Sequence, residues 1–216
     1  MKFYPKLFSA KTFIFLLLLL QACTQKNNSS EAPTLIDTLK GQAANQYAGI
    51  DQSPMDISYF PQDYPQQKIG KPIPAAPPVA RVIYSRPHKK NRIIFSDNQK
   101  SLCPYGKPWR LGANEATEIE FFKPVVINQK NIPAGRYVMY CIPFADKWVV
   151  AINNNIDSWG LQIDPIKDLL RTEIPVQKQH PALEDFTLVF LSANYGADLL
   201  MAWDDVKVVM PIMFSN

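Results

Sequence analysis

Short apolar or alternating segments, separated by turn-forming residues, dominate the chain from about residue 76 to its end. Residues 117–121 alternate with a period of two, which places Thr117, Ile119 and Phe121 on one face and the two glutamates on the other. Clusters of Pro, Gly and Asn separate the segments. With almost no helical periodicity, this pattern predicts an antiparallel β-sandwich of about nine or ten short strands, with a jelly roll or a barrel as alternatives. The expected strands cover residues 80–84, 92–95, 117–121, 125–127, 136–142, 148–152, 169–176, 186–191, 199–203 and 206–212.

Residues 1–22 have the organisation of a lipoprotein signal peptide. A basic segment precedes an apolar run at 13–20, and small Ala22 stands before Cys23. The run is too short to cross a hydrocarbon core, which needs roughly 20 apolar residues. We therefore expect cleavage before Cys23 and lipidation of that cysteine with more than one acyl chain. An ordinary secretory signal, or a short anchor with an incidental cysteine, is the alternative.

Lipidation would fix the mature protein to a membrane of a diderm bacterial envelope, on the periplasmic side or at the cell surface. The membrane is then a partner through the lipid anchor. This location excludes cytosolic roles, including those that depend on ATP, NAD or reduced thiols in solution, and we expect no cofactor.

Residues 23–75 are rich in Gln, Asn, Ser and Pro, and only residues 33–45 suggest a weak helix. We expect a lipidated flexible tether here, with an end-to-end distance on the order of 40 Å, followed by the β-sandwich domain at 76–216. In the alternative, the aromatic residues Tyr59, Phe60 and Tyr64 near the end of the tether pack on the domain.

The charge of the mature chain is close to neutral. Three of the 23 basic residues lie in the signal, which leaves 20 Lys and Arg against 19 Asp and Glu, a net charge of +1. The one basic cluster, at 88–92, is typical of a solvated turn, so we expect no nucleic-acid partner.

Two cysteines remain besides Cys23. In an oxidising compartment Cys103 and Cys141 could form a disulfide, which would close a loop of about 38 residues and stabilise the fold by roughly 3–4 kcal/mol. Both stand in apolar surroundings, however, where a thiol behaves as a small buried hydrophobe. The sequence leaves both possibilities open.

One block, at 103–121, is denser in unusual residues than turns require: Cys-Pro-Tyr-Gly-Lys-Pro-Trp-Arg-Leu-Gly-Ala-Asn-Glu-Ala-Thr-Glu-Ile-Glu-Phe. With Tyr-Ser-Arg-Pro at 84–87 before it and Ile-Pro-Ala-Gly-Arg-Tyr at 132–137 after it, the chain resembles domain-of-unknown-function family 2911, a group of bacterial exported proteins. The resemblance covers about residues 77–212. It implies an exported location and a fold, and it implies no activity.

Charged side chains in that block need partners, because charges between strands are costly when unpaired. If Gly112 allows a sharp bend, Arg110 and Glu115 turn toward each other, with Arg86 as a second donor to Glu115, and form a polar clamp that closes one end of the sandwich. Alternatively, the same groups line a mouth in which an arginine binds an anionic or hydroxylated ligand and Trp109 stacks on it. The candidate ligand-binding residues are Arg86, Trp109, Arg110, Asn114 and Glu115.

Few features of the sequence indicate catalysis or metal binding. His88 and His180 are the two histidines; they lie far apart in sequence, and no spacing typical of a metal site occurs. We expect both histidines in surface loops and assign no catalytic or metal-binding residue. Acidic pairs at 118/120, 184/185 and 204/205 are expected to be solvated.

The tryptophans suggest a sugar ligand as one possibility. Trp148 and Trp203 lie in apolar strands and are expected in the core, whereas Trp109 and Trp159 lie at turns and could be exposed. We expect a binding or accessory module with a small polar or sugar ligand; the protein partner is left open. The alternatives are a hydrolase of glycan or peptide that uses Glu115 with Arg110 or Arg86, and a purely structural envelope component.

Overall fold

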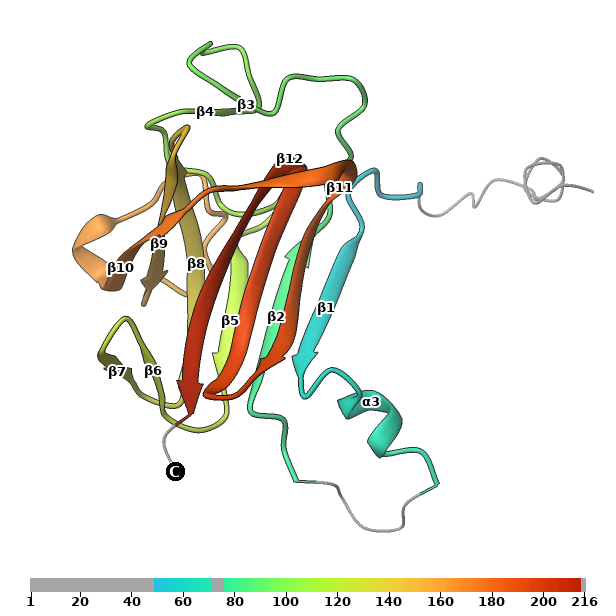
Figure 1. Cartoon of the computed structure of the whole chain (residues 1–216), viewed down its shortest axis with the longest axis vertical. Coiled ribbons are helices and arrows are strands. Elements are labelled where there is room, and N and C mark those ends of the chain that lie inside the picture. Colours follow the sequence, from blue (N-terminus) through green and yellow to red (C-terminus); the bar gives the residue numbers. More distant parts are fainter. Residues whose placement is uncertain (1–48, 71–75, 215–216) are drawn as a thin grey trace, which may run out of the picture. The chain divides into compact units, whose positions relative to one another are not determined.

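Two antiparallel sheets build the fold in the computed structural model, which describes residues 49–70 and 76–214 (Figure 1). The larger sheet has six strands in the order β1-β2-β5-β8-β9-β10, and the smaller has the order β11-β12-β6-β7. The strands of the larger sheet are β1 (Met55–Phe60), β2 (Ala80–Ser85), β5 (Thr117–Phe121), β8 (Gly135–Pro143), β9 (Lys147–Asn153) and β10 (Asp168–Pro175).

Alternation of side chains gives the larger sheet an apolar inner face. In β5, Thr117, Ile119 and Phe121 are at most 1% exposed, whereas Glu118 and Glu120 point outward. The outward glutamates lie near arginines of neighbouring strands: Glu120 lies 2.7 Å from Arg81, and Glu118 lies 3.6 Å from Arg136. The period-two pattern therefore fixes which face of the sheet is buried.

The smaller sheet consists of β11 (Gln177–Ala193), β12 (Gly196–Phe214), β6 (Val125–Ile127) and β7 (Lys130–Ile132). Its two long strands are bent. β12 turns at Asp204, whose φ is 54°, and its far end returns to its beginning, where the Phe214 amide donates to the Tyr195 carbonyl at 3.1 Å. Two strands that the sequence predicts separately, at 199–203 and 206–212, are thus the two arms of one bent strand.

Three small elements complete the described part of the chain: a parallel pair, β3 (Phe95–Ser96) and β4 (Cys103–Pro104); a one-turn helix, α3 (Tyr64–Gln67); and a 3-10 turn, η1 (Pro165–Lys167). None of the described helices is long and apolar enough to cross a membrane.

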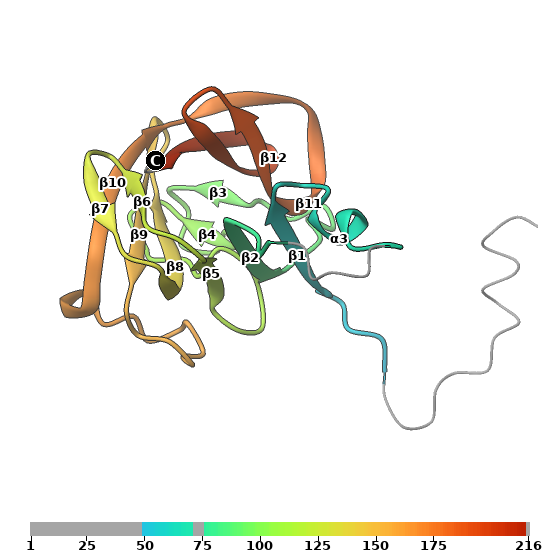
Figure 2. The same ribbon diagram turned by 90° about the horizontal axis from the view of Figure 1, so that it is seen from below.

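The core lies between the two sheets and is unusually aromatic at one end. Viewed from below in Figure 2, β11 and β12 lie on one side and β2, β5 and β8 on the other. Trp148, Trp203 and Phe186 are at most 1% exposed, and Trp109 packs among them. Burial of each such side chain contributes about 1.5–3 kcal/mol, and edge-to-face contacts add to this.

The predicted all-β sandwich is confirmed, as is the placement of Trp148 and Trp203 in the core. The folded unit, however, starts at Ile50 and not at residue 76. Strand β1 pairs with β2 along its whole length, and Phe60 packs on Phe190 and Phe214. The flexible tether predicted for 23–75 is therefore too long, and the alternative of packing on the domain holds for its end.

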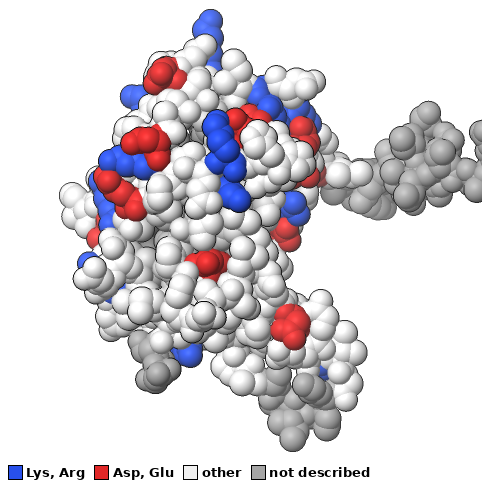
Figure 3. Space-filling model, viewed as in Figure 1, with Lys and Arg blue, Asp and Glu red and all other residues white. Residues whose placement is uncertain are grey.

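The signal peptide at 1–22, Cys23 and the weak helix expected at 33–45 lie outside the described residues. Over the described part, Figure 3 shows positive and negative side chains intermixed on the upper part of the face it displays, with few charges below.

Candidate functional site

A pocket of about 340 Å³ opens where β2 ends and β5 begins, beside β3 and β4. Loops from distant parts of the sequence form its walls: the connection after β2, the block before β5, and the connection between β9 and β10. Its lining residues are Ser53, Pro87, Arg92, Leu102, Cys103, Pro104, Pro108, Trp109, Arg110, Gly112, Ala113, Gly160, Leu161 and Trp203. We call it the arginine pocket, because Arg92 and Arg110 are its charged lining residues.

Trp109 and Trp203 form the aromatic floor of the arginine pocket. Their rings stack at 5.7 Å between centroids with an interplanar angle of 25°. The backbone of Trp109 is held against Cys141 by two hydrogen bonds of 2.7 and 2.9 Å, and its indole Nε1 donates to the Gly112 carbonyl at 3.1 Å. One face of Trp109 is thus occupied by Trp203, so the ligand stacking predicted for Trp109 is limited to the half-buried part that lines the pocket.

The sharp bend before β5 differs from the one expected at Gly112. Positive φ values fall at Leu111 (54°) and Asn114 (59°). Gly112 is needed for a close approach instead, because a Cβ there would lie 2.9 Å from the Ser85 carbonyl oxygen. This close approach brings the start of β5 against the end of β2. It also lets the Gly112 carbonyl accept the hydrogen bond from the Trp109 indole.

Arg110 is held against the connection between β9 and β10. Its Nη1 donates to the Trp159 carbonyl at 3.1 Å. Gly160 makes this contact possible, since it has a φ of 77° and an added Cβ would lie 2.9 Å from the Arg110 Cβ. Partial burial lowers the pKa of Arg110 by desolvation. Among the described residues no carboxylate lies within 4 Å of its guanidinium.

Arg92, which the sequence did not single out, lies on the same pocket. Its Nε donates to the Lys89 carbonyl at 3.0 Å and its Nη2 to the His88 carbonyl. Like Arg110, it has no carboxylate partner within the part of the chain that the structure describes. The only sequence signal was its position in the basic cluster at 88–92, which is also typical of a solvated turn.

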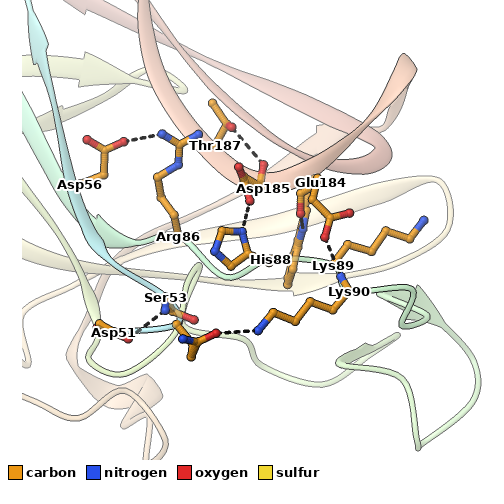
Figure 4. Close-up of polar contacts among 12 residues, drawn as sticks. Asp51, Ser53, Asp56, Arg86, His88, Lys89, Lys90, Glu184, Asp185 and Thr187 are labelled. Carbon is orange, nitrogen blue, oxygen red and sulfur yellow. Dashed lines mark hydrogen bonds and ion pairs between the residues drawn. The ribbon is translucent and has the colours of Figure 1, made fainter. Parts of the chain in front are cut away.

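Ion pairs dock that cluster on β11 and β12, and Figure 4 shows the pair between His88 and Asp185. His88 Nδ1 contacts the Asp185 carboxylate, and Lys89 Nζ contacts Asp204. The Lys90 amide donates to Glu184 Oε1 at 2.8 Å. The expectation of two histidines in surface loops is therefore met only in part: His180 is exposed but lies in strand β11, whereas His88 lies in the connection after β2 but is half-buried in this contact. These contacts position Pro87 and Arg92 on the arginine pocket.

The predicted clamp does not form. Arg86 Nη1 pairs with Asp56 Oδ2 at 2.9 Å (Figure 4). Glu115 is exposed and lines a separate hollow of about 200 Å³ beside β1. Asn114 bonds the segment before β1, with its Nδ2 2.8 Å from Asp51 Oδ2. Of the five predicted site residues, the structure brings Trp109 and Arg110 together in the arginine pocket and places the other three outside its lining.

Cys103 and Cys141 are both free thiols in the structure and at most 1% exposed. Desolvation by burial raises the pKa of each well above the usual range of a thiol. Cys103 lines the arginine pocket, but its sulfur is poorly suited to act as a nucleophile, because the thiolate is strongly disfavoured.

The acidic pairs that the sequence offers make structural contacts, although they keep part of the expected exposure: Glu184 is exposed, and the Asp205 side chain is 45% exposed. Asp204 and Asp205 pair with Lys89 and Lys178, respectively. Within the described residues, no group of three His, Cys, Asp or Glu side chains is placed to hold a metal ion.

A larger hollow of about 440 Å³ lies elsewhere, between β10 and the ends of β6 and β12. Its lining is mostly apolar, and its one charged member, Glu173, pairs with Lys147 at 2.8 Å. The arginine pocket is the smaller of the two, but it combines charge, aromatic surface and hydrogen-bond donors, which are the features that give ligand sites their specificity.

A family model described as "Protein of unknown function (DUF2911)" matches residues 71–212. No curated protein and no solved structure matches the chain. The match spans most of the folded unit, including every residue that lines the arginine pocket except Ser53.

Proposed function

This chain belongs to the family described as a protein of unknown function (DUF2911), and we propose that it is a lipid-anchored binding module of the bacterial cell envelope. The binding site is the arginine pocket, and the ligand is a small anionic or hydroxylated molecule. One observation carries this proposal: Trp109 and Arg110, two residues marked by sequence alone as ligand contacts, line one pocket with Arg92 and with no Asp or Glu in the lining.

The absence of acidic lining residues favours binding over hydrolysis. A hydrolase that works through Glu115 with Arg110 or Arg86 needs these groups around one cleft. Glu115 lies on another hollow, and Arg86 is paired with Asp56. A purely structural component, in turn, has no need for an open pocket with two arginines that lack carboxylate partners among the described residues.

The location part of the proposal is supported by the sequence at 1–23, with its basic segment, short apolar run and Cys23. A tether of Gln, Asn, Ser and Pro then leads to the folded unit at Ile50. A binding module held near a membrane surface can capture small molecules that diffuse through the envelope.

Binding without turnover is the property to test. The full mature chain is titrated with benzoate, phenyl phosphate, N-acetylglucosamine and a dipeptide while tryptophan fluorescence is recorded, because Trp109 and Trp203 line the pocket. At least one probe should bind and remain chemically intact. Binding should weaken in Arg110→Lys and stay unchanged in Glu115→Gln.

Two results would contradict the proposal. Turnover of a glycan or peptide that is lost in Glu115→Gln would establish a hydrolase instead. Failure of every probe to bind, with the protein folded as judged by circular dichroism, would leave the structural component as the better explanation.

A further inference from the structure

We infer that the ligand of the arginine pocket is an amphipathic organic anion, whose charged group binds Arg92 and Arg110 and whose apolar part lies on Leu102 and Leu161. This inference rests on the proposed function, because it names the class of ligand for the same pocket.

The chain has six arginines, and all of them lie in the described residues. Four have a carboxylate within 4 Å, in the pairs Arg81–Glu120, Arg86–Asp56, Arg136–Glu118 and Arg171–Asp168. Among the residues that the structure describes, only Arg92 and Arg110 have backbone carbonyls as their sole polar partners. Both of them line the arginine pocket.

Arg92 and Arg110 give the lining of the arginine pocket a positive charge. A guanidinium keeps its proton in proteins, so both groups remain positive. Arg110 is also partly desolvated, which makes its charge costly without a counter-ion. The pocket lining contains no Asp or Glu. A bound anion would supply the missing counter-charge, and a carboxylate, phosphate or sulfonate group suits the forked geometry of a guanidinium.

Exposed apolar side chains in the pocket lining favour an organic anion over a bare inorganic one. Leu161 is 71% exposed and Leu102 is 40% exposed, and both line the pocket. Trp159 is 63% exposed and directly precedes Gly160 of the pocket lining. Its carbonyl accepts a hydrogen bond from Arg110. Inorganic phosphate would leave this apolar surface in water, whereas a ligand with an apolar part would cover it.

Two fluorescent dyes with similar ring systems test the role of charge. Anilinonaphthalene sulfonate carries one negative charge, and N-phenyl-1-naphthylamine is neutral. We expect the folded full chain to bind the anionic dye at one saturable site, at least about tenfold more tightly than the neutral dye. Raising the salt concentration should weaken binding of the anionic dye.

Substitutions locate the charged group of the ligand. Arg92→Gln and Arg110→Gln should each weaken binding of the anionic dye by about five- to tenfold. Arg110→Lys, which keeps the charge, should lose less. The matched control is Arg86→Gln, which removes an arginine that pairs with Asp56 outside the pocket, and it should bind the dye as the parent chain does.

A second pair of substitutions locates the apolar part. Leu161→Ser should weaken binding of the anionic dye, whereas Ile166→Ser should not, because Ile166 is 92% exposed in the same connection but does not line the pocket. Phenyl phosphate should displace the dye at concentrations at which inorganic phosphate does not.

The outcomes distinguish this inference from the proposed function. Equal affinity for both dyes, or equal displacement by inorganic phosphate and phenyl phosphate, would overturn the amphipathic anion and leave a binding pocket of another specificity. A loss of dye binding in Arg86→Gln as large as that in Arg110→Gln would overturn it as well. If neither dye and none of the small probes binds the folded chain, both proposals fail.

Discussion

Backbone carbonyls hold Arg92 and Arg110 in place without neutralising them. A guanidinium has several N–H donors in a fixed fork, and Arg110 uses one of them on the Trp159 carbonyl while Arg92 uses two on the turn at 88–89. Donors therefore remain for a ligand on both side chains. The two arginines are oriented in advance, which reduces the conformational entropy that binding would otherwise cost.

Trp109 and Arg110 could be predicted because they stand in a block with more unusual residues than a turn needs. Arg92 could not, since its sequence neighbours His88, Lys89 and Lys90 are typical of a solvated turn. What separates Arg92 from an ordinary surface arginine is the docking of that turn on Asp185 and Asp204. These contacts join residues about a hundred positions apart, and no local pattern encodes them.

The buried thiols lead to a prediction about reactivity. In a Cys23→Ser chain, Cys103 and Cys141 should not react with Ellman's reagent at neutral pH while the protein is folded, because burial raises the pKa of both thiols and excludes the reagent. After denaturation without a reductant, two thiols per chain should react. Recovery of thiols only after reduction would show instead that the two cysteines form a disulfide.

The raised pKa values of the two thiols also determine how the stability of the protein changes with pH. Burial keeps both thiols protonated in the folded state at pH values at which the unfolded chain has lost these protons. Their contribution to stability is therefore complete below the unfolded pKa of about 8.5. The free energy of unfolding should fall as the pH rises above that value, and thermal melts between pH 8 and 10 would measure the change.

At the scale of elements, the strands of the larger sheet were the easiest to predict. Six of the ten expected segments match β2, β5, β6, β8, β9 and β10 to within one residue at either end. In each of these segments, turn residues bound an apolar or alternating run on both sides. The hydrophobic pattern and the turn signals therefore agree. By contrast, β7 was missed, because its residues Lys130–Ile132 overlap an Asn-rich turn signal.

Strand β1 was missed for a different reason. Its sequence, Met-Asp-Ile-Ser-Tyr-Phe, alternates weakly and stands in a region rich in Gln and Pro. It becomes a strand because it pairs with β2 and because the Phe190 amide donates to the Ser58 hydroxyl at 3.3 Å. Tertiary contacts therefore outweigh local composition here.

The position of β1 leads to a truncation test. A chain that begins at Ile50 should unfold at the same temperature as the mature chain, because the folded unit begins there. A chain that begins at Ala76 loses β1 and the packing of Phe60 on Phe190 and Phe214, and loss of one buried phenylalanine alone costs about 3 kcal/mol or more. Its melting temperature should therefore drop by at least about 6 °C, as measured by circular dichroism. Equal melting temperatures would show that β1 is dispensable and that the boundary expected at residue 76 was right.

On the scale of the whole molecule, the two sheets provide a rigid frame and the loops at one end provide the chemistry. The walls of the arginine pocket come from the segment before β1, the connection from β2 to β5 and the connection between β9 and β10, all of the larger sheet, and Trp203 of β12 in the smaller sheet contributes to its floor. The fold class could be predicted from periodicity alone, whereas the pocket depends on which loop ends meet. That is a property of strand order, which a single sequence does not reveal.

The anchor and the folded unit should be separable, because Cys23 precedes the folded unit that starts at Ile50. In Cys23→Ser, incorporation of labelled palmitate should be lost and the protein should move from the membrane fraction to the soluble fraction of the envelope or remain as uncleaved precursor. Its melting temperature and dye binding should equal those of the lipidated chain.

Ser29→Ala, in the same N-terminal segment, should leave both labelling and fractionation unchanged. If Cys23→Ser remained fully labelled, the lipoprotein interpretation of residues 1–23 would be wrong; if it lost dye binding, the pocket would depend on the anchor, which the independence of the folded unit argues against.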